Sequence, residues 1–572
     1  MRVLPVSDAA LMVELADLRQ TLALFEVLQQ APLPGVRETV PAARTILLEF
    51  APWQTSAAAL AAQLRQCWQQ ALAQLRAGDV TRQGLQIEIP VRYEGQDLEA
   101  LAERLGMSVA QLIECHTSCE YQAAFAGFAP GFVYLAGNPF GQSIPRLASP
   151  RTRVPAGSVA VAGDFSAIYP KDSPGGWQLL GVTPCQMWDM RRSEPVLLRP
   201  GMRVRFVDMA RAPASIHLPA APSGAADTDQ AAQRSAVAAC PAQQQASPAG
   251  LGARLRVRAA GLQTLIEDLG RGGKTAMGVS ASGALDKAAL RRANRLVGNP
   301  AGTPALENVL GQLQLACEQG HAVLAVTGAP VPLRIRTACG RVLTAQMDHP
   351  LALDAGDVLE IGTPTAGVRV YVAVRGGLDV PRVLDSCATD TLAGIGPEPV
   401  RSGDLLAVGT AVAAMQLQAV EADLPPTDGE GTSFARAGDV VTLDVVLGPR
   451  TDWFTDDAVA LLQSQQWQVT PQSNRVGMRL HGAQALTRRA QFRDAELPSE
   501  GTVCGALQVP PSGQPVLFLA DHPLTGGYPV IGAIASWDLD RCAQIPVGAF
   551  VRLRAVAPFE ALTEGQACGG KE

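Results

Sequence analysis

The sequence lacks the features that mark several specialised classes of protein. Lys and Arg number 47 against 53 Asp and Glu, a formal charge of −6, so no cationic excess is available to neutralise a nucleic-acid backbone. Eleven cysteines in 572 residues are too sparse for a disulfide scaffold. Charged residues make up only 17% of a chain that is 47% hydrophobic, which excludes disorder as its overall state. We therefore expect folded domains with mostly reduced thiols and no nucleic-acid partner.

Long apolar runs are missing as well. The most membrane-like stretch, residues 405–420, is interrupted by Thr410, Gln416 and Gln418 and is shorter than the roughly 18 apolar residues that a membrane span requires. The first eight residues reach a proline and an acid before the apolar core of a signal peptide can form. We therefore expect a cytoplasmic protein without a membrane partner, and the length of the chain predicts about three to five domains.

A segment rich in Ala, Pro, Ser and Gln divides the chain. Residues 211–250 contain almost no large apolar side chain and show neither helical nor strand periodicity, which is typical of a flexible linker. On both sides the sequence changes to short apolar runs with Gly and Pro between them. We expect an α/β domain at residues 1–84 and a β-rich domain at 85–210 before the linker, a β-rich module at 251–562 after it, and a tail at 563–572.

Hydrophobic periodicity gives the secondary structure within these units. Apolar residues that recur at three and four positions predict helices over residues 18–29, 56–77, 97–105 and 288–296, whereas alternation predicts a strand over residues 85–90. Elsewhere, short β-branched runs follow one another at close spacing, which is typical of barrels and sandwiches. The predicted fold class is mainly β with α+β elements.

One pattern occurs twice. Residues 154–157 (VPAG) precede residues 175–181 (GGWQLLG), and residues 509–513 (VPPSG) precede residues 526–532 (GGYPVIG). Two related β-folds in tandem would produce this repeat, and so would chance similarity between Gly-rich hairpins. The repeat favours a tandem architecture.

A Gly-rich stretch at residues 270–275 (GRGGKT) ends like a phosphate-binding loop. The full motif needs a glycine five positions before its Gly-Lys pair, where this chain has Asp268, so we do not interpret the stretch as a P-loop. A turn that presents backbone amides beside Arg271 can still bind an anion.

His116 lies between Cys115 and Cys119, as in half of a metal site. No second Cys/His pair follows at zinc-like spacing, so we expect buried thiols and no metal. The near-neutral pKa of an imidazole suits proton transfer, and a hydrogen-bonded histidine at a strand edge is the alternative.

Cationic and polar side chains gather late in the first unit. Arg151 and Arg153 alternate along an extended segment and are expected to share a face, as suits a carboxylate or phosphate ligand. Lys171 and Trp177 follow in a Gly-rich loop. A loop this rich in functional groups predicts a binding site.

The second unit has a comparable region at residues 473–528. A carboxylate and an imidazole before a Gly-Gly loop suit general acid-base chemistry, although surface ion pairs would give the same pattern. The candidate residues are Arg475, Arg479, Glu500, Asp521 and Tyr528. Asp286 precedes the helix predicted at 288–296, where its structural role would be an N-terminal cap.

Long motifs in both units resemble a known pair of families. The segments GFAPGFVYL, PRLASPRTRVPAGSVAVAG and IYPKDSPGGWQLLG resemble the B-subunit family of bacterial 5-oxoprolinase, also described as allophanate hydrolase subunit 1 or sporulation-kinase inhibitor. The segments DLGRGGKTAMGVSASGALDKAALRRANRLVGNPAGTPALE, RGGLDVPRVLDS, SNRVGMRLHG and SEGTVCGALQVPPSGQPVLFLADHPLTGGYPVIG resemble the C-subunit family of the same enzyme. The resemblance covers nearly the whole chain apart from the linker.

The resemblance implies a fusion of the B and C subunits with cyclophilin-like β-barrels, the first preceded by a small α/β domain. It implies ATP-dependent hydrolysis of 5-oxoproline (pyroglutamate) to glutamate, with ATP and its Mg²⁺ as co-substrate and the separate A subunit of 5-oxoprolinase as partner. It leaves a homodimer open. On this interpretation His116, Lys171, Glu500 and Asp521 are catalytic, and the residues that bind substrate or ATP are Arg151, Arg153, Trp177, Arg271, Asp286, Arg475, Arg479 and Tyr528.

Departures from the family patterns keep other functions open. The first family usually has Gln-Thr-Gly before Ile-Tyr-Pro, where this chain has Phe165, Ser166 and Ala167, and an arginine where this chain has Val182. Residues 399–404 (PVRSGD) also differ from the usual Gly-Arg turn of the second family. One alternative is a biotin-dependent carboxyltransferase related to urea carboxylase, although the chain has no biotin-attachment Met-Lys-Met motif. A regulatory module resembling a histidine-kinase inhibitor is the other.

Overall fold

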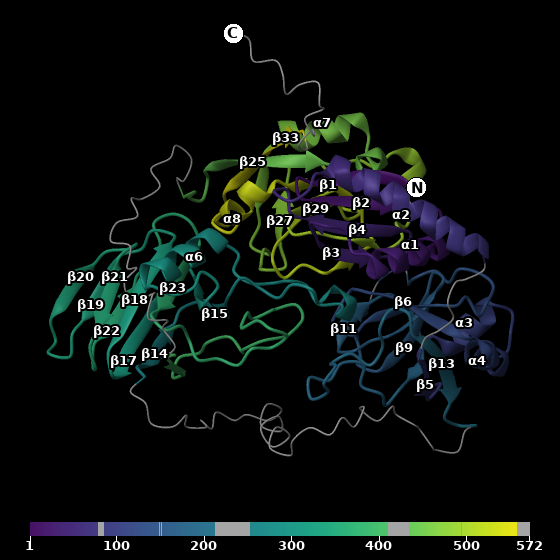
Figure 1. Ribbon diagram of the computed structural model, residues 1–572, viewed down its shortest axis with the longest axis horizontal. Coiled ribbons are helices and arrows are strands. Elements are labelled where there is room, and N and C mark those ends of the chain that lie inside the picture. Colours follow the sequence, from purple (N-terminus) through teal and green to yellow (C-terminus); the bar gives the residue numbers. More distant parts are fainter. Residues whose placement is uncertain are drawn as a thin grey trace, which may run out of the picture.

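The computed structural model describes residues 1–77, 85–147, 149, 151–211, 252–409, 434–493 and 495–557. The prediction of a mainly β chain with tandem β-barrel modules and a small α/β domain before the first is confirmed, although only part of the second module is a barrel (Figure 1). The expected linker lies outside the described residues apart from Arg211, as do the expected tail and residues 410–420 of the apolar stretch. No helix of the described part is long and apolar enough to cross a membrane.

The α/β domain is a four-stranded sheet with two helices on one face. Its elements are β1 (Arg2–Ser7), β2 (Ala10–Glu14), α1 (Leu18–Gln30), β3 (Val36–Pro41), β4 (Thr45–Phe50) and α2 (Ala57–Ala77), and the strand order is β1-β2-β4-β3. Asp17 caps α1 by accepting from the backbone N of Gln20 at 2.8 Å. Both helices were predicted to within one residue at either end.

The first barrel closes through its terminal strands. Its sheet has the order β12-β9-β10-β7-β6-β13-β5, and a bridge between Arg92 and Val182 joins the ends. The strands are β5 (Gln86–Val91), β6 (Tyr121–Ala126), β7 (Val133–Ala136), β9 (Ser158–Ala162), β10 (Phe165–Ile168), β12 (Gln178–Val182) and β13 (Arg203–Asp208). A separate hairpin pairs β8 (Arg151–Val154) with β11 (Ser173–Gly175).

Two helices follow the first strand of this barrel. Helix α3 (Leu98–Arg104) and the strand β5 confirm the predictions for residues 97–105 and 85–90. Helix α4 (Val109–Ser118) was not predicted, although Ser108 and Gln111 form a capping box at its start. His116 therefore lies on a helix, and the alternative that placed it at a strand edge is wrong.

The first part of the second module is a sandwich of two sheets that remain open, in contrast to the barrels expected throughout this module. The six-stranded sheet has the order β20-β19-β22-β17-β14-β24 and the five-stranded sheet the order β15-β16-β23-β18-β21. Leu255, Leu315, Leu306 and Val372 belong to the core between the sheets. The strands are β14 (Arg254–Ala260), β15 (Gln263–Glu267), β16 (Ala305–Val309), β17 (Leu313–Gln319), β18 (Ala322–Gly328), β19 (Leu333–Arg336), β20 (Val342–Ala345), β21 (Pro350–Leu353), β22 (Val358–Ile361), β23 (Arg369–Val374) and β24 (Leu405–Ala407).

Helix α6 (Lys287–Leu296) covers the five-stranded sheet and confirms the helix predicted at residues 288–296. Its apolar side packs Leu290 and Ala293 against Ala325 and Tyr371. A single 3-10 turn, η1 (Thr275–Met277), follows the Gly-rich stretch instead of the helix that a P-loop requires.

The second barrel is closed, with the order β25-β32-β29-β30-β27-β26-β33. Its strands are β25 (Val440–Leu447), β26 (Trp467–Val469), β27 (Gly477–His481), β29 (Ala506–Gln508), β30 (Val516–Phe518), β32 (Val530–Ile534) and β33 (Phe550–Val556). Its helices are η3 (Thr451–Trp453), α7 (Asp456–Ser464), η4 (Ala490–Phe492), η5 (Ser536–Asp538) and α8 (Leu539–Cys542). A hairpin pairs β28 (Glu500–Gly501) with β31 (Thr525–Gly526).

The two barrels have the same topology, strand for strand. In chain order, the first, second and last strands are β5, β6 and β13 in one barrel and β25, β26 and β33 in the other. In each barrel the last strand runs parallel to the first and antiparallel to the second. The hairpin strands β8 and β11 occupy the same places in the chain as β28 and β31. The repeated sequence pattern therefore reflects two equivalent folds.

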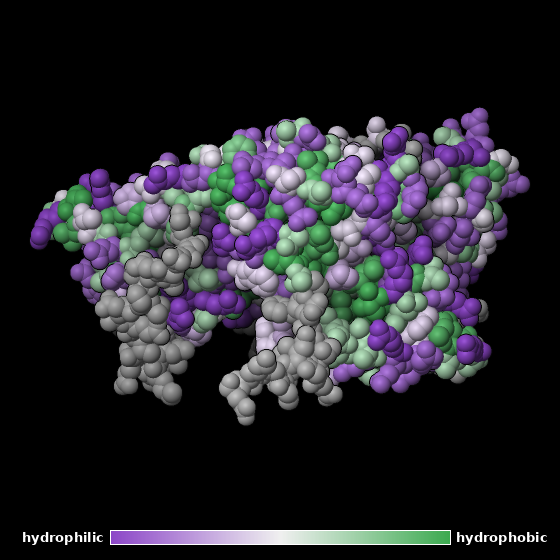
Figure 2. Space-filling view, turned by 90° about the horizontal axis from the view of Figure 1, so that it is seen from above, coloured by the Kyte–Doolittle hydropathy of each residue, from purple (hydrophilic) through white to green (hydrophobic). Residues whose placement is uncertain are grey.

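The α/β domain packs its second face on the second barrel rather than only on its neighbour in the chain (Figure 1). Met12 and Leu47 share a hydrophobic cluster with Phe518 and Val530. Hydrophobic residues on the face shown in Figure 2 form small groups among hydrophilic ones. The two halves of the chain are thus joined by a continuous core.

Candidate functional site

A short loop of the sandwich contacts both barrels. We call residues 390–393 the bridging loop. Lys171 of the first barrel donates from Nζ to two carbonyl oxygens of this loop, at 2.5 and 3.1 Å. Asp521 of the second barrel accepts through Oδ2 from the backbone N of Thr391, at 2.9 Å, and from its hydroxyl, at 2.6 Å. The loop is therefore held by a cation on one side and an anion on the other.

Asp390 fixes the conformation of the bridging loop from within. Its Oδ1 accepts from the backbone N of Leu392 at 3.0 Å and of Ala393 at 2.8 Å. Its Oδ2 accepts from the hydroxyl of Ser280 at 3.2 Å. Burial, and then the charge of Asp521, raises the pKa of Asp390.

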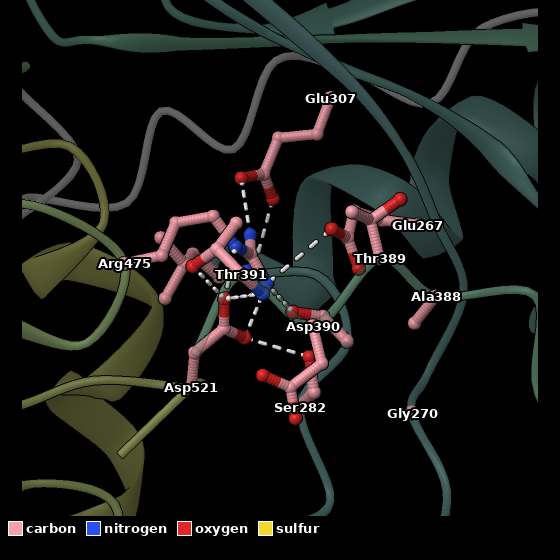
Figure 3. Close-up of polar contacts among 12 residues, drawn as sticks. Glu267, Gly270, Ser282, Glu307, Ala388, Thr389, Asp390, Thr391, Arg475 and Asp521 are labelled. Carbon is pink, nitrogen blue, oxygen red and sulfur yellow. Dashed lines mark hydrogen bonds and ion pairs between the residues drawn. The ribbon is translucent and has the colours of Figure 1, made fainter. Parts of the chain in front are cut away.

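A buried guanidinium organises the carboxylates behind the loop (Figure 3). Arg475 binds Asp521 through Nε and Nη2, each at 3.0 Å, and Glu307 through Nη1 at 2.6 Å. Nη2 also donates to the carbonyl oxygen of Gly283 at 2.7 Å and lies 3.4 Å from Glu267. The side chain of Arg475 is only 2% exposed, and those of its three carboxylate partners at most 1%.

Arg475 does not neutralise its three carboxylate partners equally, and Glu307 also has the guanidinium of Arg369 3.5 Å away. Burial disfavours the charged form of Asp521 and Glu307, but their contacts with Arg475 hold the pKa of each below its usual value. Glu267 lies farther from Arg475, so burial raises its pKa well above the usual value. The cluster therefore pairs two ionised carboxylates with one that favours its protonated form.

Some buried polar atoms beside this cluster have no hydrogen-bond partner. They are both carboxylate oxygens of Glu267 and the Nε and Nη1 atoms of Arg271. Arg271 Nη2 donates to the carbonyl oxygen of Ala388, and Nη1 lies 4.0 Å from Asp390. The junction thus contains one carboxyl group and two N–H donors that make no hydrogen bond within the described residues, which suits a polar ligand.

Comparisons with known proteins match both halves of the chain. The family model "Carboxyltransferase domain, subdomain C and D" matches residues 1–198, and "Carboxyltransferase domain, subdomain A and B" matches residues 277–555. The C subunit of 5-oxoprolinase from Escherichia coli K12 is 37% identical over 315 residues, which are 54% of this chain and 94% of that protein. The B subunit of 5-oxoprolinase from Escherichia coli O157:H7 is 40% identical over 178 residues, 31% of this chain and 79% of that protein.

The chain belongs to the carboxyltransferase-domain family that includes the B and C subunits of 5-oxoprolinase. It joins a B-like half to a C-like half, as the sequence motifs predicted. The crystal structure of TTHA0988 in space group P212121 superimposes with a TM-score of 0.73 at 31% identity, covering 95% of this chain and 99% of that one. The shared fold therefore extends over both halves.

His116 of the B-like half packs against the core of the first barrel. It is fully buried and stacks on Phe206, with ring centroids 4.4 Å apart. Nδ1 is 2.7 Å from the hydroxyl of Tyr93 and Nε2 is 3.3 Å from that of Ser166. Burial lowers the pKa of His116 to about 3, so we leave it out of the proposed site.

The two arginines of β8 do not form a joint clamp. Arg151 binds Asp97 at 2.6 Å, and Arg153 binds Asp172 at 2.6 Å. The Arg153 side chain is 76% exposed, whereas Arg151 is largely enclosed. Trp177 is buried in an aromatic cluster of the first barrel. Of the residues proposed in the B-like half, only Lys171 contacts the bridging loop.

In the C-like half too, only some of the predicted residues lie at the junction. Arg475 and Asp521 belong to the cluster, and Arg271 lies beside it. Arg479 is exposed on β27 and Tyr528 is 46% exposed beyond β31. These two side chains are left out of the proposed site.

Two predicted carboxylates have structural partners. Asp286 caps α6 by accepting from Ala289 N at 2.9 Å, as its position before the helix predicted, and burial raises its pKa to about 6. Glu500 binds Arg450, which also contacts Glu14 of the α/β domain at 2.8 Å. We therefore leave both out of the proposed site.

The Gly-rich stretch binds an anion that belongs to the chain itself. The backbone N of Gly273 and the hydroxyl of Thr275, the latter at 3.1 Å, donate to the carboxylate of Glu38. Lys274 binds Asp385 at 2.7 Å. No group of three or more His, Cys, Asp or Glu in the described residues could hold a metal ion.

Residues that sequence reasoning missed include Glu267, Glu307, Asp390 and Thr391. Glu307 interrupts the apolar strand β16, so a buried charge in a strand was the available signal. Asp390 and Thr391 lie in a loop whose role depends on contacts more than 100 residues away, and nothing in their local sequence indicates it.

Glu49 of the α/β domain provides a test of burial through the pH dependence of stability. It lies on β4 opposite Glu38, and burial together with Glu38 raises its pKa to about 7 from a usual 4.5. The folded state binds the proton more tightly, so this contribution to stability is present below pH 4.5 and is lost as the pH rises to about 7. We expect Glu49→Gln to stabilise the chain by about 1–2 kcal/mol at pH 8 and much less at pH 5.

Denaturant unfolding at both pH values measures this effect. Glu103→Gln, which changes an exposed carboxylate on α3, serves as the control and is expected to leave stability within about 0.5 kcal/mol. An equal change at pH 5 and pH 8 for Glu49→Gln would contradict the assignment.

Proposed function

We propose that the chain is the fused B and C component of 5-oxoprolinase, a cytoplasmic enzyme that hydrolyses 5-oxoproline to glutamate with ATP and a separate A subunit. The observation that carries the proposal is that both subunit types occur in one chain, at 94% and 79% of the length of the relatives named. The continuous core between the halves supports the two acting as a unit.

The chemistry of a lactam explains the need for ATP. Its carbonyl carbon is a poor electrophile, because the ring nitrogen donates electron density to it. Transfer of the γ-phosphoryl group to the carbonyl oxygen releases ADP and creates a leaving group. Water then adds at this carbon, and the C–N bond breaks to release the amine and leave an acyl phosphate. A second water hydrolyses the acyl phosphate to the carboxylate of glutamate and free phosphate.

The junction around the bridging loop offers groups suited to these steps. Lys171 has one Nζ–H beyond the two that bind the loop, and a cation there suits a phosphate or carboxylate oxygen. Arg271 has two N–H donors without a hydrogen bond, and burial raises the pKa of Glu267, which favours the protonated form that can donate to a developing negative charge. We propose this junction as the binding site of the lactam or of ATP.

Release of glutamate and ADP from 5-oxoproline and ATP tests the function. We expect the purified chain to form glutamate only when an active A subunit from the same organism is present. Circular dichroism verifies that the chain is folded. A folded chain that gives no glutamate with an active A subunit would overturn the proposal.

The family description favours one second candidate, transfer of a carboxyl group from biotin to an amide-like nitrogen. The sequence has no Met-Lys-Met motif, so this function requires a biotinylated carrier from another chain. Transfer of a labelled carboxyl group from carboxybiotin to urea or 5-oxoproline would distinguish this function from hydrolysis, because carboxyl transfer forms no glutamate.

A further inference from the structure

The two barrels carry ion pairs of opposite polarity at corresponding places. In the first barrel, Arg151 Nη2 lies 2.6 Å from Asp97 Oδ1. In the second, Arg450 Nε lies 3.0 Å from both carboxylate oxygens of Glu500. All four side chains are largely enclosed, with exposed fractions of 22% and 11% in the first pair and 6% and 7% in the second.

Backbone contacts show that Asp97 and Arg450 are equivalent. Each is the N-cap of the first helix after the first strand of its barrel, α3 in one case and η3 in the other. Asp97 N donates to the carbonyl oxygen of Leu179 at 3.2 Å, and Arg450 N donates to that of Val530 at 3.0 Å. Leu179 and Val530 occupy the same place in the repeated sequence, three residues after the second Gly of the Gly-Gly pair.

The partners Arg151 and Glu500 are equivalent by strand register. Each begins the first strand of its hairpin, β8 or β28. Arg151 pairs with Gly175 and Glu500 with Gly526, and both glycines are the first of a Gly-Gly pair. Each ion pair therefore fastens a hairpin to the loop after the first strand of its own barrel.

The hairpins are continuous with the residues that hold the bridging loop. Lys171 is the third residue beyond β10 and Asp521 the third beyond β30. The second hairpin strand begins at Ser173 in the first barrel and at Thr525 in the second. A hairpin that shifts must therefore displace its Lys171 or Asp521.

We propose that the pairs Asp97–Arg151 and Arg450–Glu500 are positioning pairs for the candidate site. They hold the two hairpins so that Lys171 and Asp521 contact the bridging loop from opposite sides. Neither pair touches the loop, so both act through these two residues.

The opposite polarity gives the pairs a second consequence. If the hairpins exchanged barrels, Asp97 would face Glu500 and Arg450 would face Arg151. Both contacts would join like charges, which is unfavourable in an enclosed position. The reversal therefore favours attachment of each hairpin to its own barrel within a chain that contains two equivalent folds.

Hydrogen exchange at the bridging loop tests the proposal without reference to activity. We expect Arg151→Met and Glu500→Gln each to speed exchange of the Thr391 amide about tenfold or more, because that amide is held by Asp521 and the loop by both barrels. In Arg151→Met, Asp97 still accepts a hydrogen bond from the backbone N of Leu179. In Glu500→Gln, Arg450 still forms its ion pair with Glu14. Arg151→Lys, which retains the charge, is expected to exchange within about threefold of the unmodified chain.

Arg203→Met is the matched control, because Arg203 pairs with Glu120 elsewhere in the first barrel. If Arg151→Met and Glu500→Gln speed exchange no more than this control, the positioning role is overturned. Should Arg151→Met fail to fold, Arg151→Gln and Glu500→Gln decide the outcome.

The activity arm rests on the proposed function. We expect Arg151→Met to lower kcat for glutamate formation about tenfold to a hundredfold while KM stays within about twofold, with most of kcat recovered in Arg151→Lys. An unchanged kcat would overturn the role. If the unmodified chain forms no glutamate, the proposed function fails, and the exchange measurement still decides the positioning role.

Discussion

Replacing Arg475 by leucine is expected to lower the free energy of unfolding of the C-like half by about 3–5 kcal/mol. The guanidinium is nearly inaccessible and contacts Asp521, Glu307 and Glu267. Its removal takes the ion-pair partner from buried Asp521 and Glu267 and leaves Glu307 only Arg369, 3.5 Å away. Loss of one partner from a buried ionic network typically has an effect of this size. Denaturant unfolding followed by the fluorescence of Trp453 and Trp467, both buried in the second barrel, measures the change.

The pH dependence separates this electrostatic effect from a packing effect. In the unmodified chain the pKa values of Asp521 and Glu307 lie below their usual values. The two carboxylates therefore contribute to folding stability at a pH above their usual pKa values, and this contribution is lost as the pH falls through the lowered pKa values. Without Arg475 the same carboxylates favour protonation. We therefore expect the stability deficit of Arg475→Leu to shrink as the pH falls from 7 to about 4.

Arg479→Leu provides the matched control. Arg479 is an exposed arginine four residues farther along the same segment, so its replacement is expected to change stability by no more than about 0.5 kcal/mol. Equal losses in the two variants, or a deficit for Arg475→Leu that is independent of pH, would contradict the ionic account of the cluster.

The sequence predicted elements whose signals are local. Helix α1, helix α2 and helix α6 have clear apolar periodicity, and the repeated Gly-Gly pattern favoured a tandem architecture. Helix α4 was missed because its start depends on a capping box and because the apolar face of the helix is short. Contacts that close a barrel, such as the bridge between Arg92 and Val182, have no local signal at all.

The candidate site was only partly predictable for the same reason. Lys171, Arg271, Arg475 and Asp521 were selected as polar residues in Gly-rich or charge-poor surroundings, and all four lie at the junction of the barrels and the sandwich. Residue type alone could not separate them from Arg151, whose partner lies 54 residues away in the chain. A charge used for folding and a charge free for a ligand look alike until the partner is known.

Replacing Lys171 by methionine is expected to lower kcat/KM for glutamate formation about a hundredfold, given the proposed function. The ammonium group binds two carbonyl oxygens of the bridging loop and has one more donor. Methionine has a similar length but no donor, so the loop loses its contact with the first barrel and a ligand anion loses a cation. Burial lowers the pKa of Lys171, and no carboxylate of the described residues forms an ion pair with it, so the change leaves two carbonyl oxygens without this donor but no carboxylate without its ion-pair partner.

The controls distinguish this loss from unfolding. Lys274→Met removes a lysine whose partner Asp385 is exposed, and it is expected to keep activity within about twofold. Lys171→Arg keeps the charge, but its planar fork cannot reproduce two contacts made by a single nitrogen, so we expect it to recover little activity. Because Lys171 is partly enclosed rather than central to a core, its loss should lower stability by only about 1 kcal/mol. Full activity in a folded Lys171→Met chain, assayed with the A subunit, would show that Lys171 is not part of the site. It would also show that activity does not require the bridging loop to be held from both barrels.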